Sequence, residues 1–174
     1  MNHLSLYENF SKPYYEFNMP EFYNAFRAVF NKEKEIEDKR CLDYGLTTPD
    51  GLLLPHYSDG IFKLLNISIP NWKHIVVSSI IEEVIKLILI DKEVEFFDNY
   101  RDDNEIEFGR VKNLKCNPIV FSGELDTFIF KIMLYDSNDW IEQVDYSHPV
   151  KVYGKKTEIE KYIEMISDTN KYNL

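Results

Sequence analysis

The residues of this chain that could do chemistry are mainly carboxylates. The 174 residues include 30 aspartates and glutamates, and clustered carboxylates with a neighbouring lysine are what a metal-dependent nuclease needs. Two places have that composition, Asp126 with Lys131, and Glu105 and Glu107 with Lys112. Such groupings arise by chance in so acidic a chain, and a negative field would repel a phosphate backbone. A metal-dependent enzyme of unrecognised type is therefore the less favoured alternative.

Other catalytic templates are missing from the sequence. None of the four histidines has a His or Cys neighbour at the spacing of zinc ligands. The six glycines form neither a dinucleotide-binding motif nor a P-loop, and no G-x-S-x-G sequence surrounds a serine. Cys41 and Cys116 lie far apart and are predicted to be buried free thiols. We therefore expect no catalytic residue, no metal and no cofactor.

The negative charge is concentrated in two segments. EVEFFDNYRDDNEIE (93–107) holds seven carboxylates and one base, Arg101, and YDSNDWIEQVDYSH (135–148) holds four carboxylates and no base. These segments account for the whole formal net charge of −10, because the other 145 residues carry 19 acids and 19 bases. The chain is thus an electrically balanced body with two acidic patches.

Both patches also contain aromatic residues. Tyr and Trp are enriched at the energetic centres of protein interfaces, and surrounding charge steers the encounter with an oppositely charged partner. This combination predicts a surface that binds a basic protein. The alternative, solvated loops whose aromatic side chains anchor them to the core, stays open. The predicted partner-binding residues are Glu93, Glu95, Phe97, Asp98, Tyr100, Asp102, Asp103, Glu105, Glu107, Asp136, Asp139, Trp140, Glu142 and Asp145.

The elements that must position these patches begin with a helix in the segment after Asn18-Met19-Pro20. Pro20 suits the first turn of a helix, where its missing N–H is not needed. Apolar residues from Phe22 to Phe30 then recur at helical spacing, and the charged segment 31–40 continues the helix on a solvated face or frays.

Two further helices are predicted. Residues 71–91 are apolar almost all round, which indicates a buried central helix. Because the same stretch is rich in β-branched residues, strands for VIKLILI and VEFF are the alternative. Near the C-terminus, Thr157 and Glu160 match a capping box, in which each residue can satisfy a backbone N–H of the other. A closing helix is expected to follow.

Strands are predicted where apolar residues occur at every second position instead of at helical spacing. Residues 105–114 and 126–136 alternate in this way, and 149–154 forms a short strand. A β-hairpin is also expected, with LLLPHY (52–57) and IFKLLNISI (61–69) as its arms.

Together these elements predict an α+β fold. We expect a single globular domain over 1–174, with helices packed on one face of a small, mostly antiparallel sheet. Each acidic patch adjoins one of the two best strands. If 105–114 and 126–136 pair as antiparallel neighbours, the patches meet at one end of the sheet. If a third strand (118–122) separates them, the patches lie at opposite ends.

The sequence predicts a cytoplasmic protein that does not bind membranes. The N-terminal residues lack the basic flank and apolar stretch of a signal peptide. The most apolar segment, 75–90, is interrupted by Glu82, Glu83 and Lys86. It is also shorter than the roughly 20 residues of a membrane-spanning helix.

A small, acidic domain of this kind resembles the bacterial immunity proteins of contact-dependent growth inhibition and related polymorphic toxin systems. The residues that carry the resemblance are the two patches, 93–107 and 135–148, with their aromatic side chains. The resemblance implies a non-enzymatic inhibitor that binds and neutralises a cognate toxin domain, often a basic nuclease.

In such a complex the carboxylates would occupy the groove where the toxin's lysines and arginines bind phosphate. Trp140, Tyr100 and Phe97 would supply anchors buried at the interface. We expect no direct binding of nucleic acid. The main alternative is a DNA-mimic inhibitor of a nucleic-acid-binding protein, which shares the acidic surface but would compete with any DNA.

Overall fold

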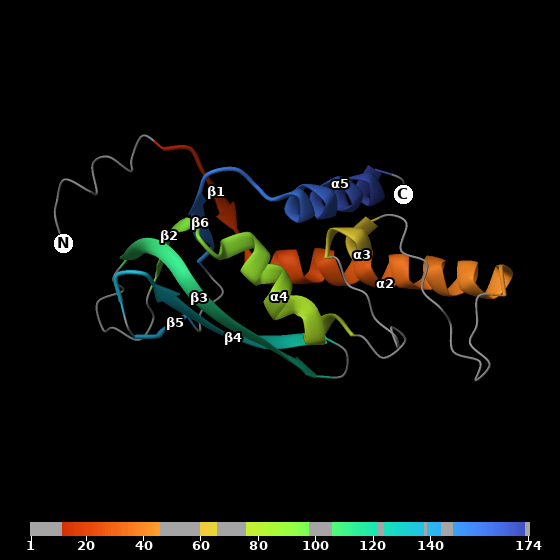
Figure 1. Ribbon diagram of the computed structural model, residues 1–174, viewed down its shortest axis with the longest axis horizontal. Helices are drawn as coiled ribbons and strands as arrows, with labels where there is room; N and C mark the ends of the chain where they lie inside the picture. The colour runs from red at the N-terminus through yellow and green to blue at the C-terminus, as the bar shows by residue number, and fades with distance from the viewer. Residues whose placement is uncertain are drawn as a thin grey trace.

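The computed structural model describes residues 12–45, 60–65, 76–97, 106–121, 124–137, 139–143 and 148–172, with the backbone alone at 120–121, 124–128, 142–143 and 170–172. The chain forms helices and strands in the following order (Figure 1): β1 (Tyr14–Phe17), α2 (Met19–Asp43), α3 (Gly60–Leu64), α4 (Val77–Leu89), β2 (Glu93–Phe97), β3 (Ile106–Phe121), β4 (Glu124–Leu134), β5 (Ile141–Gln143), β6 (Val150–Tyr153) and α5 (Glu158–Tyr172).

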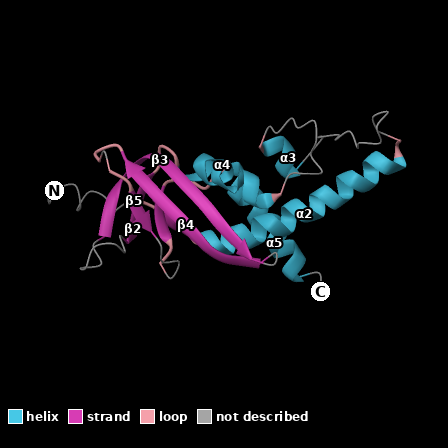
Figure 2. Ribbon diagram, turned by 90° about the horizontal axis from the view of Figure 1, so that it is seen from below, coloured by secondary structure: helices cyan, strands magenta, loops and turns pink. Residues whose placement is uncertain are grey.

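The strands form one six-stranded sheet in the order β1-β6-β2-β3-β4-β5, and every neighbouring pair is antiparallel. The helices lie on one side of it, and Figure 2 shows β3 and β4 in front with the helices behind. The predicted α+β fold, with helices on one face of an antiparallel sheet, is confirmed. Residues 118–121 are the end of β3 rather than a separate strand, so β3 and β4 are direct neighbours.

Local capping sets the start of both long helices, and the capping box of Thr157 and Glu160 is the one that the sequence predicted. The Asn18 side chain accepts a hydrogen bond from the backbone N–H of Glu21 at 3.1 Å and so caps α2. At α5, the Glu160 carboxylate accepts from the backbone N–H of Thr157 at 2.7 Å, and the Thr157 hydroxyl accepts from the backbone N–H of Glu160 at 3.4 Å. The charged segment 31–40 continues α2 as helix.

One hydrophobic core joins the helices to the sheet. Aromatic residues of α2 pack in a row, with the ring centroids of Phe26 and Phe30 5.8 Å apart, and Phe30 then contacts Phe62 of α3 at 5.2 Å. The largest fully buried side chains are Tyr23, Phe26, Phe30, Ile61, Ile81, Ile85, Ile88, Leu89, Phe96 and Phe130.

The helix predicted in 71–91 is observed as α4, and the strand alternative holds for VEFF, which lies in β2. However, α4 is not buried all round. The Leu87 side chain is 57% exposed, and the Glu83 side chain is also exposed. Glu83 and Leu87 face away from the sheet because α4 packs on β3 with only one side.

The prediction of a β-hairpin is wrong in its second arm, because residues 60–64 form the short helix α3. The Glu33 carboxylate of α2 accepts a hydrogen bond from the backbone N–H of Ile61 at 2.9 Å and one from the Tyr162 hydroxyl at 2.5 Å. Gly60, at φ +78°, leaves room for that carboxylate. A contact from 28 positions away thus decides the local conformation. The first arm, 52–57, lies outside the described residues.

The structure also tests the predictions for the two cysteines and for a membrane-spanning helix. Both cysteines are buried and unbridged, as predicted. Among the described helices, α2 is long but charged and α4 is apolar but has 13 residues, and none of them combines the length and apolarity needed to cross a bilayer.

Candidate partner-binding surface

The side of the sheet opposite the helices, which we call the open face, carries the predicted residues of β2. Side chains alternate along this strand, so that Val94 and Phe96 are buried in the core while Glu93, Glu95 and Phe97 point the other way. The sheet therefore presents the first acidic patch, as far as it is described, next to the strands that pair with β2.

Ion pairs neutralise Glu93 and Glu95, the two glutamates that this patch places on the open face. Glu95 accepts from the Lys151 ammonium at 2.5 Å and from the Tyr153 hydroxyl at 2.9 Å, both on β6. Glu93 pairs with Lys12 at 2.8 Å. Burial, followed by the hydrogen bond to Glu95, raises the pKa of Tyr153 to about 12, so this hydroxyl stays protonated and keeps donating at neutral pH. These glutamates thus contribute less free negative charge than the sequence indicated.

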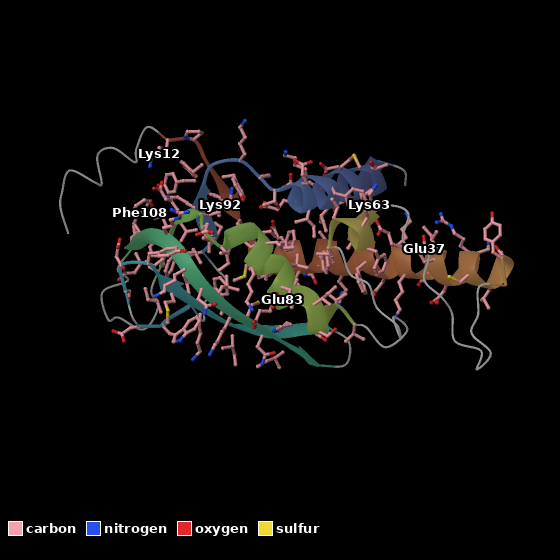
Figure 3. All side chains as sticks on the ribbon, in the orientation of Figure 1. Lys12, Glu37, Lys63, Glu83, Lys92 and Phe108 are labelled. Atoms are coloured by element: carbon pink, nitrogen blue, oxygen red, sulfur yellow. The ribbon has the colours of Figure 1, made fainter. Side chains whose placement is uncertain are left out.

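An aromatic cluster surrounds this network and was missed by sequence reasoning. The Tyr153 ring lies 5.8 Å from Tyr14 of β1 and 5.6 Å from Phe108 of β3, and the Lys151 ammonium lies 5.5 Å over the Tyr14 ring. The alternating pattern of 105–114 could have indicated Phe108, but nothing local pairs it with Tyr153. Figure 3 shows Phe108 and Lys12 at the sheet end of the molecule, away from Glu37 and Lys63 on the helices.

A second cluster lies where β4 ends. The Tyr135 hydroxyl donates to Asp91 at 3.0 Å, Arg110 lies 3.4 Å from the same carboxylate, and the guanidinium is 5.5 Å from the Tyr135 ring centroid. The hydrogen bond to Asp91 raises the pKa of Tyr135. Because the backbone N–H of Tyr135 donates to the carbonyl of Arg110 at 2.9 Å, the second acidic patch begins beside the first part of β3.

Asp136 and Asp139, in the turn between β4 and β5, are exposed and make no ion pair within the described part of the chain. They are the predicted acids whose charge the structure leaves most available. Trp140 follows them, is partly buried, and carries the Lys115 ammonium over its ring at 4.8 Å. This turn therefore combines free carboxylates with an amphipathic aromatic side chain.

The two acidic patches adjoin the same end of the sheet. Phe97 and Ile106, which flank segment 98–105, are register partners on β2 and β3. Val111 of β3 pairs with Leu134 of β4, directly before the turn with Asp136. The arrangement in which the patches meet is thus the one observed for the described residues.

The remaining predicted residues divide into three groups. Glu107 is buried at 8% exposure on the core side of β3, opposite Phe96, and so lies apart from the open face. Glu142 pairs in register with Lys131, although only its backbone is described. The predicted residues outside the described part are Asp98, Tyr100, Asp102, Asp103, Glu105 and Asp145.

A hollow of about 540 Å³ lies on the other side of the molecule, beside α4. Its lining is apolar except for Glu83 and Lys86, which pair with each other at 2.8 Å. Within the described ranges, no three His, Cys, Asp or Glu side chains are grouped so that they could hold a metal ion. The open face therefore remains the candidate site among the described residues.

No protein-family model, no curated protein and no solved structure matches this chain. Its function must therefore be inferred from the residues and geometry of the open face.

Proposed function

We propose that this protein is a non-enzymatic inhibitor that binds a basic partner domain, in the manner of the immunity proteins it resembles. The observation that carries the proposal is the direct pairing of β3 with β4, which brings the two acidic, aromatic-containing patches to one end of the sheet. A single partner could contact both.

The described contacts favour a protein partner at this end of the sheet. The rings of Tyr14, Phe108 and Tyr153 form a contiguous cluster that could be covered by a partner, and aromatic side chains of this kind dominate the energetics of interfaces. In the turn after β4, Asp136 and Asp139 are exposed and make no ion pair within the described residues. Individual exposed ion pairs contribute only about 0–1 kcal/mol, so we expect the charges to act mainly on the association rate.

In this proposal the inhibitor works by occupying a site. The partner would be a toxin domain whose lysines and arginines normally bind phosphate, and the carboxylates would take the place of that phosphate. The aromatic cluster would be buried at the interface and would slow dissociation. Segment 98–105, whose net charge is −3, would extend the acidic contact.

The test is affinity capture of the tagged protein from lysate of its native host, at low and high salt, with mass spectrometry of the bound proteins. We expect one stoichiometric partner that contains a basic domain. The double variant Asp136→Lys/Asp139→Lys should lower the association rate by about tenfold at low salt. The matched control is Glu35→Lys/Asp43→Lys, which changes the charge equally on exposed positions of α2.

Three results would contradict the proposal. Equal rates for the two double variants would show that net charge, rather than this surface, steers binding. Capture of many DNA-binding proteins that high salt releases together, with competition by generic DNA, would favour DNA mimicry. Turnover of nucleic acid by the purified protein with Mg²⁺ or Mn²⁺ would favour an enzyme.

A further inference from the structure

The long strand β3 has a neighbouring strand on both sides only in its first part. β2 pairs with Ile106–Arg110, and the last backbone hydrogen bonds on that side join Val111 to Asp91 and Lys92. Beyond Val111, β4 is the only strand that lies beside β3 in the described part of the chain. We call the other side of residues 112–121 the outer edge of β3. An unpaired edge of this kind is a template for pairing with another chain.

Three alternate positions of β3 direct their backbone nitrogen toward this outer edge. The N–H groups of an antiparallel strand point alternately to its two sides. The Cys116 N–H points to the outer edge, because it donates to the Glu82 carboxylate of α4 at 3.1 Å. Leu114 and Pro118 lie two residues before and after Cys116, and no register shift interrupts 113–119. Their nitrogens therefore face the same edge.

None of these three nitrogens has a free N–H to offer an added strand. The Leu114 N–H donates to the Asn113 side-chain oxygen at 2.8 Å, and the Cys116 N–H donates to Glu82. Pro118 has no N–H, and within sheets proline is found where its nitrogen faces an unpaired edge. The Glu82 side chain is 37% exposed, so solvent reaches the side chain that covers this edge. The outer edge is therefore blocked at each of its three successive donor positions.

The blocked positions lie where pairing with another strand would be most extensive. The strands at the two ends of the sheet, β1 and β5, have four and three residues, and short edge strands offer few hydrogen bonds. By contrast, β3 has 16 residues. Its segment LKCNPIVF (114–121) has a single charge and is mainly apolar. Apart from the proline, this composition is that of segments that pair with copies of themselves.

We propose that Asn113, Glu82 and Pro118 together close the outer edge of β3 and so prevent the chain from pairing through this edge with a second copy of itself. In such a pair the two β3 strands would run antiparallel about Cys116. Each Cys116 N–H would then donate to the Cys116 carbonyl of the other copy, and each Leu114 N–H to the Pro118 carbonyl. The inference goes beyond the proposed function, because it concerns an edge of β3 and not the open face.

The test is sedimentation velocity over a range of protein concentrations. The triple variant Glu82→Ala/Asn113→Ala/Pro118→Val frees two N–H groups and adds a third, and valine suits a buried strand position. We expect its mass to rise with concentration to twice that of the wild type and no further, because a two-fold pair uses both edges. The matched control, Glu83→Ala/Asn117→Ala/Pro118→Val, loses the same residue types from exposed positions but keeps the two blocking side chains. It should keep the wild-type mass.

A second measurement does not depend on association. Amide hydrogen exchange reports whether an N–H group is held in a hydrogen bond. We expect the Leu114 and Cys116 amides of the wild type to exchange slowly, although no described strand pairs with them on that side. Glu82→Ala should speed exchange of the Cys116 amide at least about tenfold more than that of Leu114, because only Cys116 loses its acceptor.

Each result supports or overturns the inference, whatever partner the open face binds. A folded triple variant with the wild-type mass at every concentration, or with a mass that rises beyond a dimer, would overturn it. A control that associates as strongly as the triple variant would do the same. If the triple variant does not fold, the exchange experiment decides. Slow exchange of the Cys116 amide that Glu82→Ala selectively releases supports a blocked edge, and any other pattern contradicts it.

Discussion

Glu82 connects α4 to the long strand β3, and replacing it by Ala should destabilise the protein far more than replacing its neighbour Glu83. Both carboxylates pair with Lys86, at 2.7 and 2.8 Å. Only Glu82 also accepts a hydrogen bond from the backbone N–H of Cys116, at 3.1 Å. That N–H belongs to a part of β3 that has β4 on one side, and the Glu82 carboxylate supplies the missing acceptor on the other.

The magnitude follows from these contacts. A hydrogen bond to a charged acceptor contributes about 1.5–3 kcal/mol to the free energy of unfolding. The Glu82 side chain is 37% exposed, which places it near the lower limit. The helical pair with Lys86 adds about 0.3–0.5 kcal/mol. We therefore expect Glu82→Ala to cost about 2 kcal/mol and Glu83→Ala, which loses only the pair with Lys86, about 0.3 kcal/mol.

The assay is equilibrium unfolding in urea, followed by circular dichroism. With a slope of about 2 kcal/mol per molar urea, the midpoint for Glu82→Ala should fall by about 1 M, and that for Glu83→Ala should hardly change. Equal midpoints for the two variants would refute the reasoning, because the bond to Cys116 is the contact that distinguishes the two glutamates.

The same contact predicts a dependence on pH. Although burial alone would raise it, the Lys86 ammonium and the Cys116 N–H together hold the pKa of Glu82 below its usual value. A carboxyl with a lowered pKa in the folded state stabilises the protein fully above its unfolded pKa, about 4.3, and loses this contribution as the pH falls through the folded value. The difference in stability between wild type and Glu82→Ala should therefore be constant near neutrality and shrink below about pH 4.

Two further predictions concern the core. Gly109→Ala should lower the free energy of unfolding by about 1–3 kcal/mol, because a Cβ there would lie 2.8 Å from a methyl carbon of the buried Leu134 side chain; unchanged stability in urea unfolding would show that Leu134 can move aside. Burial, followed by the nearby Glu82 carboxylate, raises the pKa of the Cys116 thiol to about 12. Iodoacetamide at pH 8 should therefore label Cys116 only after unfolding, and mass spectrometry that finds native labelling would contradict this.

Local features of the sequence were enough to predict the fold class and the starts of the main helices. Asn18 and the capping box of Thr157 satisfy backbone groups within three residues, so no distant contact is needed to identify them. The alternation in 126–136 likewise identified β4, because its apolar face is the buried one. The two acidic patches and their aromatic residues were also visible in the sequence.

The alternation of apolar and polar residues in 105–114 did not indicate which side of β3 faces the core. Ile106 is 51% exposed and Glu107 is buried, because register with β2 sets the orientation of the strand. The short strands β1 and β5 have too few residues for a recognisable pattern. Residues 60–64 form a helix because Glu33 and Tyr162 meet there from other elements.

The sequence by itself thus determined the α+β class, the capping box of the last helix and the concentration of charge in two segments, because these depend on residues close together in the chain. The tertiary structure decided which charges remain available. It paired Glu95 with Lys151 and Tyr153 across β2 and β6, left Asp136 and Asp139 exposed, and set Lys115 opposite Lys131. The physical reason is that strand order and register bring together side chains from distant segments, and these neighbours determine whether a charge is neutralised or exposed.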